Sequence, residues 1–88
     1  MSAIYLDRHE LAALEALDDG RWRTPTEIAS IAQVHVQNVR SALHRLASRR
    51  LIERGGWGDS LRWGEWRITG AGRNELDRRA QLELEVGA

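Results

Sequence analysis

Hydrophobic residues recur every three or four positions in four stretches of this 88-residue chain, the spacing that gives a helix one apolar face. These stretches predict helices over about 8–18, 25–32, 35–49 and 70–84. Asp7 and Thr24 precede the first two helices, and each has a glutamate three positions later, the pattern of a capping box. Pro25 supplies a residue favoured at the first helical position. Thr69 is expected to cap the last helix.

Between the third and fourth helices the hydrophobic period changes to two. Leu51 and Ile52 are expected to leave the third helix as a strand, turn-forming residues fill 55–59, and 61–69 is expected to return as a second strand. One face of the second strand carries Leu61, Trp63, Glu65 and Arg67, and the other carries Arg62, Gly64, Trp66 and Ile68. The pattern predicts a hairpin in which Trp66 is core and Trp63 packs on the body of the domain. Residues 21–23 form either a lone strand or a turn, with Trp22 in the core.

About three residues, 33–35, separate the second and third helices, so these helices are expected to cross steeply as a helix-turn-helix. The order of elements predicts an α+β, mainly helical fold, a winged helix-turn-helix. It consists of a three-helix core, a two- to three-stranded β-wing and a C-terminal helix. A chain of this length supports one small core, so a single domain over 1–88 is expected.

Charge is unevenly distributed, although the formal net charge is zero. Residues 21–54 contain seven arginines and two glutamates, a local net charge of +5, and the remaining residues carry −5. A basic centre between acidic ends favours one face for an anionic polymer such as DNA. The alternative interpretation of the same arginines is an ordinary solvated helix surface.

The sequence lacks the residues that several other functions require. The chain has no cysteine, and its three histidines are not clustered like ligands, so neither a metal nor another cofactor is expected. No acid, base and nucleophile constellation points to an enzyme. No apolar run approaches the roughly 20 residues that span a bilayer, and no signal-peptide pattern opens the chain. A cytoplasmic protein is therefore expected.

Four motifs, in order, resemble the winged-helix regulators of the MarR type. Residues 27–35 (EIASIAQVH) resemble the family's helix and turn, and 39–46 matches the apolar positions of its recognition helix. Residues 46–54 (LASRRLIER) are similar to its exit into the wing, and 68–73 (ITGAGR) to the start of the helix after the wing. The sequence differs from the family at His35, where a small hydroxyl residue usually caps the recognition helix, and at Arg50, where glycine is usual. The resemblance covers about half of the chain and implies a DNA-binding transcription regulator.

On this interpretation the helix 35–49 reads the major groove of double-stranded DNA, since an α-helix fits that groove, and the protein is expected to act as a repressor. The candidate base-contacting residues are Gln37, Asn38, Arg40, Ser41 and His44. The candidate phosphate-contacting residues are Thr26, Arg45, Arg49, Arg50, Arg54 and Arg62. Trp57, in the predicted turn, is a candidate contact for the wing or a partner.

Apolar residues near both ends predict a homodimer, which would bring two recognition helices to successive major grooves. These residues are Ile4, Tyr5 and Leu6, and Leu76, Ala80, Leu82, Leu84 and Val86. The alternative function is a winged-helix adaptor that binds another protein through its tryptophan-rich wing and terminal helices. Net neutrality and acidic ends favour that alternative.

Overall fold

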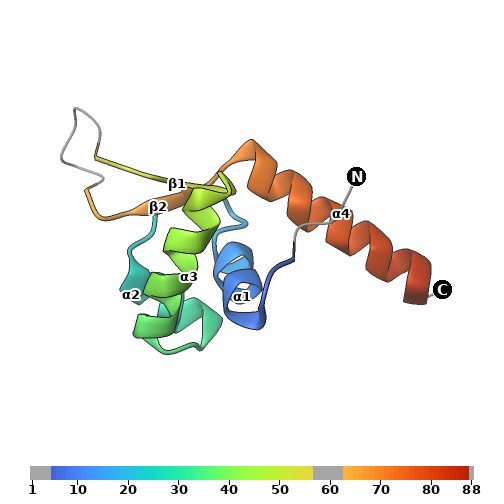
Figure 1. Cartoon of the computed structure of the whole chain (residues 1–88), viewed down its shortest axis with the longest axis horizontal. Coiled ribbons are helices and arrows are strands. Elements are labelled where there is room, and N and C mark those ends of the chain that lie inside the picture. The colour runs from blue at the N-terminus through green and yellow to red at the C-terminus, as the bar shows by residue number, and fades with distance from the viewer. Residues whose placement is uncertain (1–4, 57–62, 88) are drawn as a thin grey trace.

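Three short helices pack together and carry a hairpin at one end and a long helix at the other (Figure 1). The computed structural model describes residues 5–56 and 63–87, with the backbone alone at 86 and 87. The elements are α1 (Arg8–Ala16), α2 (Pro25–Ala32), α3 (Val36–Ser48), β1 (Ile52–Arg54), β2 (Trp66–Ile68) and α4 (Gly70–Gly87). This is the predicted α+β, mainly helical winged helix-turn-helix. The second helix has its predicted bounds, α1 ends two residues early, and α4 extends three residues further.

Both predicted capping boxes form. The Glu10 N–H donates to Asp7 Oδ1 at 2.8 Å, and the Asp7 N–H donates to Glu10 Oε1 at 3.1 Å. At α2 the Glu27 N–H donates to Thr24 Oγ1, and the Thr24 N–H donates to Glu27 Oε1. The backbone hydrogen bonds to their carboxylates lower the pKa of Asp7 and of Glu27 below their ordinary values. Both boxes satisfy helix N–H groups that would otherwise lack an intrahelical partner.

The helix α3 lies at the centre of the core. Its apolar face buries four residues, Val39, Ala42, Leu43 and Leu46, against α1, α2 and β1. The other buried residues of the core are Leu6, Ala13, Leu14, Ala16, Leu17, Ile28, Ala29, Leu51, Ile52, Trp66 and Ile68. The position of Leu6 corrects the expectation that it belongs to a free terminal stripe, because its side chain is only 7% exposed.

The wing is a two-stranded antiparallel sheet with Ile52 opposite Ile68 and Arg54 opposite Trp66. Trp66 and Ile68 are buried and Arg67 lies on the other face, which confirms the predicted alternation within β2. Arg23 adds a single bridge, its N–H donating to the Trp66 carbonyl at 2.9 Å. Of the strand expected over 61–69, only Trp66–Ile68 is a strand among the described residues, and 61–62 lie outside them. A turn at 63–64 precedes the strand, and Gly64 has a φ of 79°, a left-handed conformation that glycine adopts readily.

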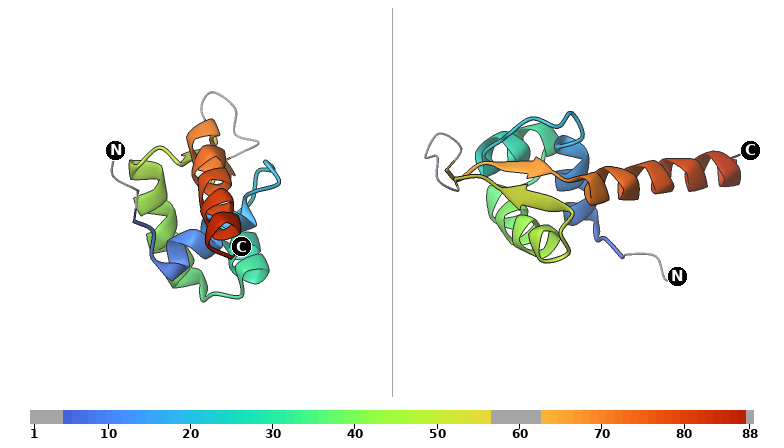
Figure 2. Two further views of the ribbon diagram at one scale, coloured as in Figure 1. Left: turned by 90° about the vertical axis from the view of Figure 1, so that its right-hand side faces the viewer. Right: turned by 90° about the horizontal axis from the view of Figure 1, so that it is seen from above.

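The helix α4 starts against the sheet and then projects away from the body, at the end opposite the hairpin (Figures 1 and 2). Thr69 caps it as predicted, since its Oγ1 accepts from the Gly72 N–H at 3.1 Å. Beyond the first turns, contact with the body becomes sparse: Leu76 is half-buried, whereas Ala80, Leu82 and Leu84 are exposed. Leu82 and Leu84 are therefore exposed apolar side chains on the distal part of α4.

Candidate nucleic-acid interface

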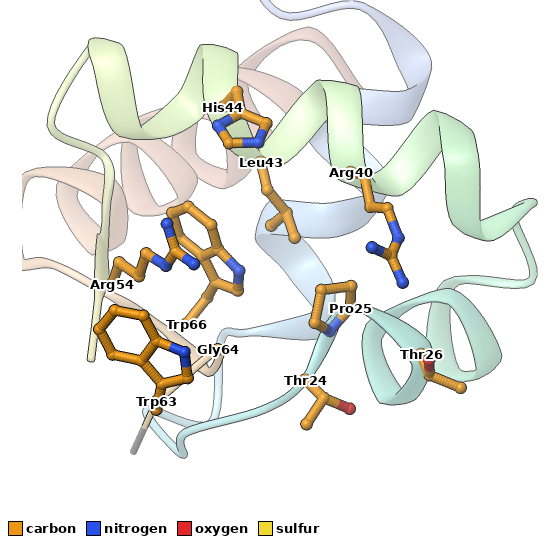
Figure 3. Close-up of a pocket in the computed structure, with 10 residues that line it drawn as sticks. All are labelled: Thr24, Pro25, Thr26, Arg40, Leu43, His44, Arg54, Trp63, Gly64 and Trp66. Atoms are coloured by element: carbon orange, nitrogen blue, oxygen red, sulfur yellow. The ribbon is translucent and has the colours of Figure 1, made fainter. Parts of the chain in front are cut away.

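A groove of about 430 Å³ lies between the start of α2, the exposed side of α3 and the hairpin (Figure 3). Its walls come from segments far apart in the sequence, which the fold brings together. The lining residues are Thr24, Pro25, Thr26, Arg40, Leu43, His44, Arg54, Trp63, Gly64 and Trp66. Two arginines and two threonine hydroxyls make this groove suited to an anion, and the indoles make one wall aromatic.

Four of the predicted base-contacting residues share one exposed strip of α3. Gln37, Arg40, Ser41 and His44 follow the spacing of three and four that places side chains on the same side of a helix. Arg40 extends from α3 towards Pro25 and the start of α2, and His44 lies one turn further along (Figure 3). The Arg40 side chain is exposed and lines the groove, and among the described residues its guanidinium has no ion-pair partner.

The other predicted contacts on α3 lie on its α1 side. Arg45 Nη2 is 3.2 Å from Asp7 Oδ2, and Arg49 Nη1 is 3.1 Å from Glu10 Oε2. Arg49 also donates to the Tyr5 carbonyl at 2.6 Å. The structure therefore assigns these two arginines to a contact between α1 and α3 and does not bring them to the groove.

Asn38 also lies outside the groove, beside a second depression formed with the helix-turn-helix turn and the start of α1. The base-contacting candidates are consequently split between two sides of α3. Of the phosphate candidates, Thr26 and Arg54 line the groove. Trp57 and Arg62 lie outside the described residues.

Aromatic side chains surround Arg54 on the hairpin. Its guanidinium carbon is 5.4 Å from the Trp63 ring centroid and 5.6 Å from that of Trp66, within the range of cation–π attraction. His44 meets Trp66 edge-on at 5.9 Å. Trp63 corrects the expectation that it packs on the body, because it is 68% exposed. Alternation predicts which side of a strand a residue occupies, but Trp63 lies in the turn before β2, where most of its surface stays exposed.

His35 is a residue whose role the sequence analysis missed. Its Nδ1 accepts a hydrogen bond from the Gln37 N–H at 3.2 Å, so it caps α3 in place of the usual hydroxyl residue. A hydrogen-bond acceptor at the first position of the predicted helix 35–49 was the available signal. The side chain thereby orders the first turn of α3, where Gln37 starts the exposed strip.

The helix α3 ends with Arg50 in a left-handed conformation, φ 62°. The Leu51 N–H donates to the Leu46 carbonyl and the Arg50 N–H to the Ala47 carbonyl, a hydrogen-bond pattern that favours glycine at the position of Arg50. The side chain is exposed and has no ion-pair partner among the described residues. An arginine here carries a conformational cost that glycine avoids.

Comparison with solved structures finds MarR-family regulators. One from Silicibacter pomeroyi has a TM-score of 0.73 at 25% identity, over 91% of this chain and 57% of its own. A regulator from Neisseria meningitidis has a TM-score of 0.67 at 24% identity, over 91% and 58%. A Bordetella bronchiseptica protein, whose DNA binding is regulated by 6-hydroxynicotinic acid, has a TM-score of 0.73 at 18% identity, over 93% of this chain and 62% of its own.

The chain thus resembles MarR-family transcription regulators, as its motifs predicted, and spans less than two-thirds of the length of these neighbours. No family model matches the sequence, and no curated protein does. Across 5–56 and 63–87, no group of three or more histidine or acidic side chains could hold a metal ion. Within the same ranges, no helix is both long and apolar enough to cross a membrane.

Proposed function

We propose that this protein is a sequence-specific regulator of transcription that binds double-stranded DNA and acts as a repressor. The observation that carries the proposal is the exposed polar strip of α3 beside the cationic groove. An α-helix enters the major groove of B-form DNA, and its exposed side chains reach base edges there. The MarR-family neighbours support a DNA-binding regulator at the level of fold.

In this arrangement Arg40 faces guanine, and Gln37 faces adenine, the bases that match their hydrogen-bonding groups. Ser41 and His44 continue the same strip. Thr26, Arg50 and Arg54 contact phosphates on the flank of the helix. Because Arg45 and Arg49 are paired with α1, we assign them a smaller share of the phosphate contact than the sequence suggested.

We also propose a homodimer, with the distal half of α4 as part of the interface. Leu82 is 45% exposed and Leu84 is 71% exposed on a helix that projects from the body. Burial of such side chains against a second copy removes apolar surface from water. Sedimentation is expected to show a dimer, and a monomer both free and on DNA would contradict this assignment.

Arg40→Ala is expected to reduce discrimination between the preferred duplex and a scrambled duplex by about tenfold, because one bidentate base contact contributes about 1–3 kcal/mol. The duplex is first selected from a random pool, and fluorescence anisotropy then measures binding at several salt concentrations. Wild-type affinity is expected to fall steeply as salt rises, through release of counterions from neutralised phosphates.

Arg78→Ala is the matched control, because Arg78 lies on α4 and pairs with Glu75 at 2.6 Å. Its affinity and sequence preference are expected to match those of the wild type. Failure of the wild-type protein to bind any duplex would overturn the DNA proposal in favour of the adaptor alternative, which the exposed Trp63 supports.

Arg50→Gly is expected to raise the free energy of unfolding by about 1 kcal/mol, since it removes a left-handed arginine. It is also expected to lower DNA affinity. The slope of log affinity against log salt concentration is expected to fall by about one, the effect of losing one phosphate contact. Urea denaturation and salt titration measure the two effects. Gln33→Gly is the control, because Gln33 has a φ of 57° at the end of α2 and carries no charge. An Arg50→Gly variant that binds DNA as tightly as the wild type would remove Arg50 from the phosphate contacts.

A further inference from the structure

Trp63 is an exposed aromatic residue whose ring is held in place. It is 68% exposed, yet it packs closely on Gly56: a Cβ added to Gly56 would lie 2.3 Å from Trp63 Cε3. Gly56 has a φ of 105°, a conformation that residues with side chains rarely adopt. The backbone at Gly56 therefore makes room for the indole on the side of the hairpin.

Arg54 adds a second constraint on the same ring. Its guanidinium carbon lies 5.4 Å from the Trp63 centroid and 5.6 Å from that of Trp66, which is buried. The buried Trp66 therefore anchors Arg54, and Arg54 in turn lies against Trp63. An aromatic side chain ordered before binding loses little conformational entropy when it contacts a ligand.

The position of Trp63 indicates what it contacts. Trp63 and Arg54 are on the hairpin wall of the groove, and Arg40 and His44 are on the α3 wall (Figure 3). If α3 lies in the major groove, the phosphate strand that borders it runs along this cationic groove. The minor groove lies on the far side of that strand, where the hairpin wall is.

We propose that Trp63 enters the minor groove and stacks against a base, partly separating one base step of the bound duplex. The inference rests on the proposed function and adds a DNA-deforming residue to it. Apolar side chains that enter the minor groove unstack base steps and kink the duplex, and steps that deform easily are preferred. Trp63 thereby contributes selectivity through the deformability of the DNA. Arg54, beside the indole, supplies positive charge to the neighbouring phosphates.

The surface chemistry favours DNA over a protein partner. Arg40 and Arg54 share the groove with Trp63, and none of the described residues that line it is acidic. Trp22, which was predicted to lie in the core, is instead half-buried, and it provides an internal comparison because it also contacts an arginine: the Arg67 guanidinium carbon lies 4.5 Å from its ring centroid. Arg67 pairs with Glu53 on the sheet face opposite Trp66, away from the groove. Among the described residues, the contacts of Arg54 with Trp63 and Trp66 lie within the cationic groove, whereas the contact of Arg67 with Trp22 lies outside it.

The test uses the full chain and the duplex selected from the random pool, with 2-aminopurine replacing adenine at one position at a time. Wild-type protein is expected to raise the 2-aminopurine fluorescence at one step, because unstacking relieves quenching. Trp63→Ala is expected to abolish this rise and to weaken binding about tenfold, within the range for loss of one base–aromatic stack. Trp63→Phe is expected to retain most of both effects.

Trp22→Phe serves as the matched aromatic control outside the groove, and its binding and fluorescence are expected to equal those of the wild type. Thermal unfolding of each variant establishes that it is folded. Wild-type binding with no fluorescence change at any position, and equal affinity for Trp63→Ala, would overturn this inference and leave the proposed function intact. Absence of duplex binding by the wild type would overturn both.

Discussion

Gly72→Ala is expected to lower the free energy of unfolding by about 3 kcal/mol, the upper part of the usual range for overpacking. A Cβ at this position would lie 2.1 Å from the Leu51 carbonyl oxygen and 2.8 Å from Ile68 Cγ1. The Leu51 carbonyl also accepts the Thr69 N–H at 3.0 Å, so its movement would disturb the connection between β2 and α4. The added methyl would thus separate α4 from the sheet.

Gly70→Ala is the matched control, because a Cβ there would meet nothing within 4 Å. In a helix, alanine is favoured over glycine by up to about 1 kcal/mol, so this variant is expected to be neutral or more stable. Urea denaturation, followed by tryptophan fluorescence and circular dichroism, measures both variants. A chain of this size has a total stability of roughly 4–13 kcal/mol, so the predicted loss is a large part of it. Equal stabilities for the two variants would contradict the close approach of Gly72 to Leu51 and Ile68.

Glu10→Gln is expected to lower the free energy of unfolding by about 2 kcal/mol. The Glu10 side chain is 3% exposed, caps α1 and lies 3.1 Å from Arg49 Nη1 and 3.7 Å from Arg45 Nε. Removal of one partner from a buried ion pair costs about 3–5 kcal/mol. The expected loss is smaller here because both arginines are more than one-third exposed. Glutamine can still accept the Asp7 N–H, so the change tests the charge.

Glu15→Gln provides the control on the same helix, because Glu15 is exposed and has no ion pair among the described residues. Its stability is expected to stay within about 0.5 kcal/mol of the wild type. Chemical denaturation at neutral pH separates the two expectations. Equal effects of the two substitutions would show that Glu10 acts only as a helix cap and that its arginine contacts add no stability.

Local features of the fold could be predicted from the sequence in detail. The starts of α1 and α2 depend on hydrogen bonds between residues three positions apart, such as Thr24 with Glu27. The interior of α3 depends on the spacing of its own apolar residues. Both signals lie in residues close together in the sequence, so they can be recognised without knowledge of the tertiary structure. The helix-turn-helix and the hairpin followed from the order of these elements.

The candidate site could be predicted only in part. Periodicity indicates which side of α3 is polar, and Arg40 and His44 do line the groove. Periodicity does not indicate which other segments of the chain contact the polar residues of α3. Arg45 meets Asp7 across 38 positions, and Arg49 meets Tyr5 across 44. Periodicity also does not predict the exposure of Trp63, because this exposure depends on which segments pack against the turn before β2.

The sequence by itself determined the helices, the caps of α1, α2 and α4, the hairpin and the basic centre of the chain, because each depends on residues close together. The tertiary structure alone decided how the arginines divide between the groove and α1. It also decided that Gly56 and Arg54 hold an exposed Trp63 beside α3. These arrangements depend on which surfaces meet when α1, α3 and the hairpin pack, and residues distant in the sequence determine that packing.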